Sequence, residues 1–208
     1  KDIDVFSKPN PSFSVNDGCD GDSIAFTNNS TIQLDTISNY DWQFGDTKTS
    51  TTESPKHLYS GPGNYDIKLI LTSVKGCQDS VTNSVDVNEK PSSSFTSTTE
   101  CKDDSTEFTN NSSITAGTIS SYAWNFGDGF SSTSTAPKHL YNAAGSYTVS
   151  LISFSNEGCS DTATVSTTVN PRPVVNFSAS NVCFGDNLSP TNNTSISGGS
   201  ISSYNWDF

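Results

Sequence analysis

Tyr122-Ala123-Trp124-Asn125-Phe126-Gly127-Asp128-Gly129 carries the strongest structural signal in this chain. Tyr122, Trp124 and Phe126 alternate with smaller or polar residues, so their side chains are expected on one face of a β-strand. The following Gly-Asp-Gly favours a tight turn, because glycine tolerates a positive φ and aspartate hydrogen-bonds to its own backbone. The run therefore predicts a strand with an aromatic inner face, closed by a sharp turn.

The same run recurs at intervals of 82 residues, as Tyr40-Asp41-Trp42-Gln43-Phe44-Gly45-Asp46 and as Tyr204-Asn205-Trp206-Asp207-Phe208. The tryptophans of these runs are Trp42, Trp124 and Trp206, and two further sets have the same spacing: Cys19, Cys101 and Cys183; Phe13, Phe95 and Phe177. A fixed period of this size indicates tandem domains, each with its own core. We expect the end of a preceding repeat at residues 1–8, complete repeats at 9–88 and 91–170, and the first half of a third at 173–208, as part of a longer array.

The rest of each repeat has the pattern of an all-β fold. Residues 65–71 and 147–151 alternate between apolar and polar side chains, residues 81–87 read as a final strand, and no stretch keeps a helical period. Short strands between Gly, Asn and Pro turns predict one immunoglobulin-like antiparallel β-sandwich per repeat. The linkers at residues 88–91 and 170–173 contain proline, so we expect semi-rigid joints and a rod of domains.

Composition excludes several classes of function. The net charge is -12, from 22 acidic and 10 basic residues, and the basic residues are scattered. A clustered cationic face for nucleic acid or for anionic lipid is therefore not expected. The apolar runs are a few residues long, which predicts no direct membrane insertion. Neither a G-x-S-x-G nor an H-E-x-x-H motif occurs, so we expect no enzyme and no cofactor.

The cysteines predict disulfides. Cys19 and Cys77 are 58 positions apart, and so are Cys101 and Cys159. Pairing within each repeat is the simplest interpretation, and it indicates an oxidising, extracytoplasmic environment. Each such bond would stabilise its repeat by roughly 4 kcal/mol in the chain-entropy model. Buried free thiols are the alternative, because spacing does not show that two sulfur atoms meet.

Few polar residues are candidates for chemistry. Asp128 is expected to hydrogen-bond to its own turn, with a catalytic or metal-binding carboxylate as the alternative. His57 and His139 are expected to be structural and to satisfy backbone groups. Weak candidates for calcium ligands are Asp17, Asp20 and Asp22. Of these only Asp22 recurs, as Asp104 and Asp186, which favours a solvated acidic loop over a metal site.

These motifs resemble those of PKD (polycystic kidney disease) domains, whose core motif is W-D-F-G-D-G. Pro55-Lys56-His57-Leu58-Tyr59 and Pro137-Lys138-His139-Leu140-Tyr141 resemble the family's P-x-H-x-Y element, and the runs at Gly63, Gly145, Gly76 and Gly158 resemble its G-x-Y and G-C-x-D elements. Thr47 stands where the family prefers glycine, so a different turn geometry is expected in the first repeat. The motif positions, all expected to be structural, are Trp42, Phe44, Gly45, Asp46, His57, Tyr59, Trp124, Phe126, Gly127, Asp128, His139 and Tyr141.

Tandem PKD repeats with paired cysteines resemble the giant SprB-type surface adhesins of gliding Bacteroidota. That resemblance implies a non-enzymatic stalk at the cell surface, exported by type IX secretion. The implied partners are neighbouring repeats, the secretion or motility machinery and an unknown surface ligand. PKD domains also accompany secreted enzymes that degrade polysaccharides or proteins, where they aid substrate binding. That alternative needs exposed aromatic residues, for which Phe130 and Phe154 are the candidates, although the first repeat has Lys48 and Thr72 there.

Overall fold

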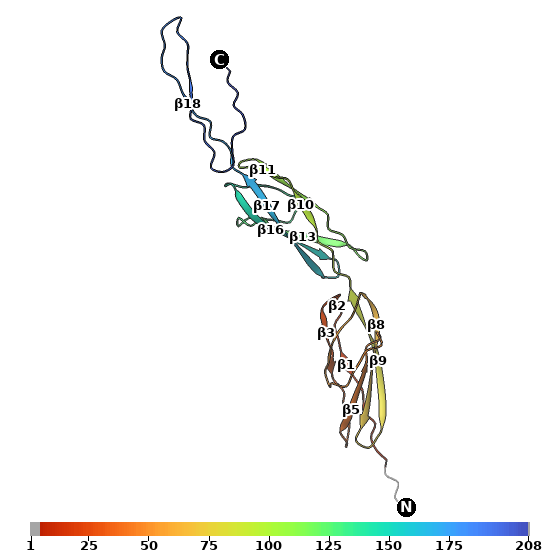
Figure 1. Ribbon diagram of the computed structural model, residues 1–208. Coiled ribbons are helices and arrows are strands. Elements are labelled where there is room, and N and C mark those ends of the chain that lie inside the picture. The colour runs from red at the N-terminus through yellow and green to blue at the C-terminus, as the bar shows by residue number, and fades with distance from the viewer. Residues whose placement is uncertain (1–4, 208) are drawn as a thin grey trace, which may run out of the picture. The chain divides into compact units, whose positions relative to one another are not determined.

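The structure is a computed structural model that describes residues 5–207 (Figure 1). Residues 1–4 of the expected tail and Phe208 of the third aromatic run lie outside the described residues. All regular structure between residues 5 and 207 is β-strand, which confirms the predicted fold class. This described part contains no helix with the length and apolar character needed to cross a bilayer.

The chain divides into two compact units. Unit 1 runs to Pro91 and also takes in Ile114–Ile119 and Phe154–Ser160, two loop regions of the second repeat. Unit 2 comprises Ser92–Ser113, Ser120–Ser153 and the chain from Asp161 onward.

The first repeat is a sandwich of two layers. Its strands are β1 (Phe13–Ser14), β2 (Gly18–Cys19), β3 (Ser23–Ala25), β4 (Thr27–Asn28), β5 (Ile37–Gln43), β6 (Thr49–Ser50), β7 (Lys56–Leu58), β8 (Gly63–Ser73) and β9 (Gln78–Asn88). One layer is a five-stranded sheet in the order β2-β9-β8-β5-β6, in which the long strands β8 and β9 form an antiparallel hairpin (Figure 1). The other layer consists of the antiparallel pairs β1-β4 and β3-β7.

Alternation along the strands builds the core between these layers. In β8, Ile67, Leu69 and Leu71 are fully buried, while Lys68 between them is exposed. Trp42 from β5 is also fully buried and packs edge-on against Phe13 at a centroid distance of 5.0 Å. The edge strand β2 runs parallel to β9, with Cys19 opposite Asn88.

The second repeat has the same topology. Its strands are β10 (Phe95–Ser97), β11 (Glu100–Cys101), β12 (Ser105–Asn110), β13 (Ile119–Asn125), β14 (Ser131–Ser132), β15 (Lys138–Leu140), β16 (Gly145–Ser155) and β17 (Ser160–Asn170). A five-stranded sheet, β11-β17-β16-β13-β14, faces a three-stranded sheet, β10-β12-β15. Trp124, Phe126 and Val149 lie in its core, at positions equivalent to Trp42, Phe44 and Ile67.

The third copy of the aromatic run has no such core in the described residues. Two short strands, β18 (Phe177–Ser178) and β19 (Thr191–Asn192), pair as β1 and β4 do. Phe177 is 58% exposed and Trp206 is 37% exposed, against 6% for Phe13 and 0% for Trp42. The aromatic residues of this segment therefore remain largely open to solvent.

The turn after the aromatic strand has the same geometry in both complete repeats, so the expectation of a different turn at Thr47 is wrong. Thr47 has a φ of 72° and its counterpart Gly129 a φ of 96°. In each repeat the phenylalanine N–H bonds across the turn at 3.1 Å, from Phe44 to Lys48 O and from Phe126 to Phe130 O. These hydrogen bonds hold threonine in a left-handed conformation that glycine adopts without steric cost.

Candidate functional site

The aspartate of the turn and the histidine of the Pro-Lys-His-Leu-Tyr element meet in each repeat. His57 Nε2 lies 2.8 Å from Asp46 Oδ2, and His139 Nε2 lies 2.7 Å from Asp128 Oδ2. The first pair is nearly buried, with side-chain exposures of 9% and 10%. The predicted bond within the turn is also present, since Asp128 Oδ1 accepts the Phe130 N–H at 3.2 Å. The histidine partner differs from the expectation, which had assigned both histidines to backbone groups.

Aromatic rings enclose the histidine. The His57 ring stacks on Phe44 with a centroid distance of 4.1 Å and an interplanar angle of 4°, and it meets Tyr59 edge-on. The Tyr59 hydroxyl donates to Phe44 O at 3.2 Å. Burial raises the pKa of Tyr59 and the nearby Asp46 charge adds to the shift, so the hydroxyl stays a donor. The second repeat repeats these contacts with Phe126, His139 and Tyr141.

Charge and burial act in opposite directions on Asp46. Burial raises the pKa of its carboxyl group, but the hydrogen bonds from His57 and from the Lys48 N–H outweigh burial and leave the pKa below its usual value. The ionised form is therefore the one that the folded state favours. The hydrogen bond between Asp46 and His57 connects β7 to the turn between β5 and β6. Strand β7 belongs to one layer of the sandwich, and β5 and β6 belong to the other.

A buried Asp-His pair can also orient a general base, as in hydrolases, but that role requires a nucleophile and access for a substrate. Here Nε2 points at the aspartate, the ring stacks on Phe44 and meets Tyr59 edge-on, and little of it reaches solvent. The same geometry occurs in both repeats, which suits a fold-stabilising role and not a single catalytic centre.

Two of the three acidic candidates for calcium have other side-chain partners. Asp17 Oδ1 accepts the Asp86 N–H at 2.8 Å, and Asp22 Oδ1 lies 2.7 Å from Lys90 Nζ. Asp20 contributes its backbone N–H to Asn88 O. Across residues 5–207 there is no group of three or more His, Cys, Asp or Glu side chains arranged to hold a metal ion. The ion pair recurs in the second repeat between Arg172 and Asp104.

The disulfide joins consecutive repeats. Cys19 is bonded to Cys159, with a Cα–Cα distance of 5.7 Å and a sequence separation of 140 residues. Cys77 and Cys101 are free. The predicted pairs Cys19–Cys77 and Cys101–Cys159 are therefore wrong, although the expectation of a disulfide is confirmed.

The long last strand of each sandwich explains the correction. Cys19 lies opposite Asn88 at the end of β9, whereas Cys77 immediately precedes Gln78 at its start. A strand rises about 3.3 Å per residue, so the two cysteines of one repeat are about 35 Å apart. A disulfide requires Cα atoms within about 7 Å. The bond within a repeat is thus sterically impossible, and the cysteine of the next repeat takes its place.

Hydrogen bonds within unit 1 also join the linker to the second repeat. The Glu89 carboxylate accepts the backbone N–H groups of Thr115 and Ala116 at 3.2 and 2.6 Å. The Ala116 N–H is the main cause of a lowered Glu89 pKa. Asn156 Oδ1 accepts the Thr118 N–H at 2.9 Å, and the Asn156 N–H donates to Thr118 O. The linker residue Glu89 is therefore hydrogen-bonded to the second repeat.

Comparison with protein families settles the class of domain. The family model described as PKD domain matches residues 7–89 and 88–169. The chain belongs to the PKD domain family. The two matches cover both complete repeats, and PKD domains are generally non-catalytic modules.

The PKD sequence has relatives among bacterial proteases. It is 48% identical over 54 residues to the microbial collagenase of Vibrio alginolyticus, a match that covers 26% of this chain and 7% of the collagenase. It is 49% identical over 53 residues to the pre-pro-metalloprotease PrtV of Vibrio cholerae, covering 26% of this chain and 6% of PrtV. The chain thus matches only a small part of either protein.

Two solved PKD structures are also similar. The PKD1 domain of Vibrio anguillarum Epp is 27% identical with a TM-score of 0.37, over 39% of this chain and 95% of that domain. The PKD1 domain of Vibrio cholerae PrtV is 26% identical with a TM-score of 0.35, over 40% of this chain and 99% of that domain. At these TM-scores the likeness carries no argument, so the assignment rests on the family model and the sheets described above.

Sequence reasoning missed two features of the PKD repeats. The Asp-His pair was missed because its members belong to different motifs, although both repeats keep the same 11-residue offset. The bond between repeats was missed because the 58-residue spacing within a repeat does not give the distance between the two cysteines in space. The rise of the predicted final strand would have separated the cysteines of one repeat.

Proposed function

We propose that this chain is a non-enzymatic structural stalk segment of a long, repetitive cell-surface adhesin that serves bacterial attachment or gliding. The observation that carries the proposal is the disulfide between Cys19 of one repeat and Cys159 of the next. A stalk must keep consecutive domains connected outside the cell, and disulfides persist in that oxidising environment. The secretion or motility machinery and a ligand at the tip are the partners that this function implies.

The contacts that the polar motif residues make support the same function. Asp46, His57 and Tyr59 are nearly buried and bond to one another or to the backbone, and the second repeat repeats these bonds. They hold each sandwich together. The net charge of -12 favours solubility in a crowded array.

Small-angle X-ray scattering of the whole 208-residue chain tests the stalk. A compact protein of this length has a radius of gyration of about 17 Å. Short proline-containing linkers between folded domains should give a value well above that, with an extended tail in the distance distribution. A radius close to 17 Å would contradict the proposal.

The Vibrio relatives favour a second candidate function, that of an accessory module in a secreted enzyme that degrades polysaccharide or protein. The module would help the enzyme to bind its substrate. The side chain that supports it is Phe130, which is 58% exposed and lies 5.7 Å from the His139 ring, centroid to centroid, at an interplanar angle of 45°. Aromatic side chains on a surface can pack against polymeric substrates.

Retention on insoluble collagen, chitin and cellulose separates the two functions. A stalk segment should not be retained on any of them. Retention that a Phe130→Ala variant loses, while its thermal unfolding is unchanged, would favour the accessory module and contradict the stalk.

A further inference from the structure

We propose that Cys77 and Cys101 each form a disulfide equivalent to Cys19–Cys159 with a cysteine of a neighbouring repeat. Every joint of the array then carries a second covalent connection besides the linker. The bonding partners are the cysteine of a preceding repeat for Cys77 and the cysteine of a following repeat for Cys101. This inference does not depend on whether the array is an adhesin stalk or an enzyme module.

The completed bond defines what such a site contains. Strand β2 places Cys19 opposite Asn88 at the end of β9. Asn88 O accepts the Asp20 N–H at 2.8 Å, and Cys159 Sγ lies 3.8 Å from the same oxygen. The Asn88 backbone is thus the common point at which both sulfur-bearing segments are positioned.

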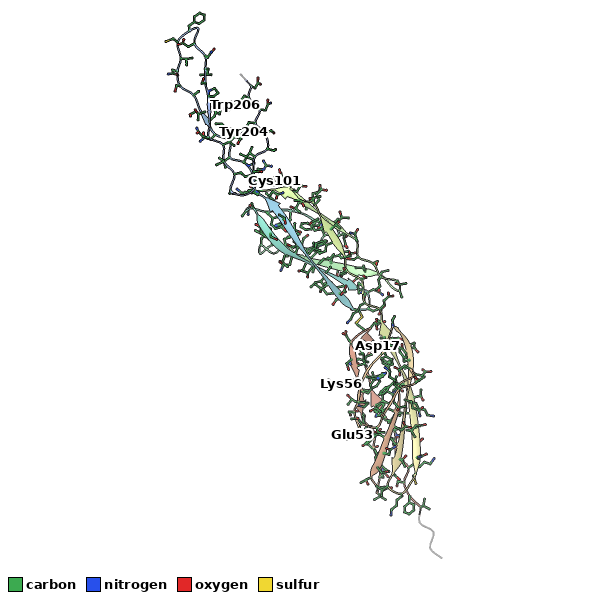
Figure 2. All side chains as sticks on the ribbon, in the orientation of Figure 1. Asp17, Glu53, Lys56, Cys101, Tyr204 and Trp206 are labelled. Atoms are coloured by element: carbon green, nitrogen blue, oxygen red, sulfur yellow. A yellow bond between two sulfur atoms is a disulfide. The ribbon has the colours of Figure 1, made fainter. Side chains whose placement is uncertain are left out.

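Cys101 has the first half of this arrangement already in place. Strand β11 places it opposite Asn170 at the end of β17, and Asn170 O accepts the Lys102 N–H at 2.7 Å. The turn after it is also the same, because the Asp104 N–H donates to Cys101 O at 2.9 Å, as the Asp22 N–H donates to Cys19 O at 3.0 Å. Figure 2 shows Cys101 at the end of the second sandwich, close to where the third repeat begins.

Cys77 has the other half. In its turn the Cys77 N–H bonds to Ser73 Oγ and the Ser73 N–H bonds to Cys77 O, and the turn at Cys159 repeats both bonds through Ser155. Cys77 Sγ lies 3.9 Å from Phe6 O, and Phe6 is the residue one period before Asn88. The sulfur therefore faces the end of a preceding repeat just as Cys159 faces the end of the first.

Only the cysteines of adjacent repeats can complete these halves. Cys101 cannot reach Cys159 within its own repeat, because β17 separates them as β9 separates Cys19 from Cys77. The bond forms from two thiols, which lose two protons and two electrons to a small disulfide oxidant such as oxidised glutathione. The oxidant is reduced to two thiols, and the reaction passes through a mixed disulfide.

Covalent bonds at every joint would redirect tension along the array. One covalent path for the tension runs from Cys19 through the disulfide to Cys159, and then along the backbone to Cys183 and its disulfide. This path does not include residues 20–76 or 102–158. A second path runs from Cys77 along the backbone to Cys101. Most of each sandwich would then bear no end-to-end load.

The first test extends the chain after Phe208 with a copy of residues 127–172, which completes the third repeat. Peptide mapping by mass spectrometry without reduction should show Cys19–Cys159 and a second disulfide between Cys101 and the added cysteine, with Cys77 and Cys183 as thiols. In a Cys101→Ser control the added cysteine should remain a thiol. A bond between Cys183 and the added cysteine, or a free Cys101 thiol, would overturn the proposal.

The second test extends the other end, by placing a copy of residues 1–82 before Lys1. Cys77 should then bond to the copy of Cys19, and a Cys77→Ser variant should leave that copy as a thiol. This arm keeps the proposal testable if the completed third repeat does not fold. A free Cys77 thiol in the extended, folded protein would contradict it.

Force spectroscopy on the 208-residue chain, pulled by its ends, tests the redirected tension. Reduction should release the 140-residue segment between Cys19 and Cys159 and lengthen the fully extended chain by about 480 Å, at roughly 3.4 Å per residue. A Cys19→Ser/Cys159→Ser double variant should have the longer contour before reduction. Equal contour lengths of the native chain with and without reductant would overturn the redirected path.

Discussion

Asp46 and His57 connect the two layers of the first sandwich through a single charged hydrogen bond. Because the hydrogen bonds to Asp46 outweigh its burial, its pKa in the folded state lies below the unfolded value. A depressed carboxylate pKa contributes stability above the unfolded pKa, and this contribution is lost as the pH falls through the folded pKa.

We therefore predict that the stability of the first repeat decreases below about pH 4. An Asp46→Asn variant should lose about 1–3 kcal/mol at pH 7, since a charge-assisted hydrogen bond is removed, and should show a flatter decrease in acid. Urea unfolding midpoints between pH 7 and 2.5 measure both effects. Asp66→Asn, which replaces an exposed carboxylate, is the matched control, and identical pH profiles for the two variants would contradict the prediction.

Thr47 has a backbone conformation that is unfavourable for its side chain. Its φ of 72° costs a β-branched residue about 1–2 kcal/mol, and the hydrogen bonds of the turn hold it there. Thr47→Gly should stabilise the first repeat by about 0.5–1 kcal/mol after the greater chain entropy of glycine is subtracted. Gly129→Thr should destabilise the second repeat by a similar amount. Amide hydrogen exchange in β5 and β13 distinguishes the repeats, and equal protection in native and variant chains would contradict the strain.

At the scale of elements, the last strand of each sandwich decides which cysteines meet. One cysteine of each repeat immediately precedes this strand, Cys77 before β9 and Cys159 before β17. The other cysteine, Cys19 or Cys101, lies beside the end of the strand, about 35 Å away. The hairpin turn before β17 belongs to unit 1, where Cys159 contacts Asn88 at the end of the first repeat. Strand length thus converts a pair of cysteines within a repeat into a bond between repeats.

Reduction of this bond should lower the resistance of the chain to unfolding. Closing a loop of 140 residues stabilises a protein by at most about 5 kcal/mol in the chain-entropy model. We predict a lower urea midpoint in the presence of reductant and in a Cys19→Ser variant, with no additional effect of reductant on that variant. Cys77→Ser should behave as the native chain, because Cys77 is free. An unchanged midpoint for Cys19→Ser would show that the bond contributes nothing.

At the scale of the whole molecule, the repeats differ in how much core they bury. The two complete repeats each have a cluster of buried apolar residues, whereas Phe177, Val175 and Phe184 are exposed in the third. We predict that amides in residues 173–207 exchange hydrogen faster than the equivalent amides in residues 91–125, because local stability follows buried apolar contact. Equal protection in the two segments would contradict this prediction.

The sequence by itself determined the class of fold and the composition of the cores. Alternation along β8 and β16 and the aromatic run before each Gly-Asp turn predicted all-β sandwiches, and the structure places Trp42 and Trp124 in the cores. These features depend on side chains two residues apart, and that spacing is fixed by the geometry of a strand.

The tertiary structure decided the contacts between residues distant in sequence. It joined Asp46 to His57 across the two layers, and it paired Cys19 with Cys159 in place of Cys77. Regular spacing shows that positions are equivalent in successive repeats, but it carries no information on which of them are close in space. Only the length and direction of the strands between them determine that, because a strand of eleven residues holds its two ends far beyond the reach of a disulfide.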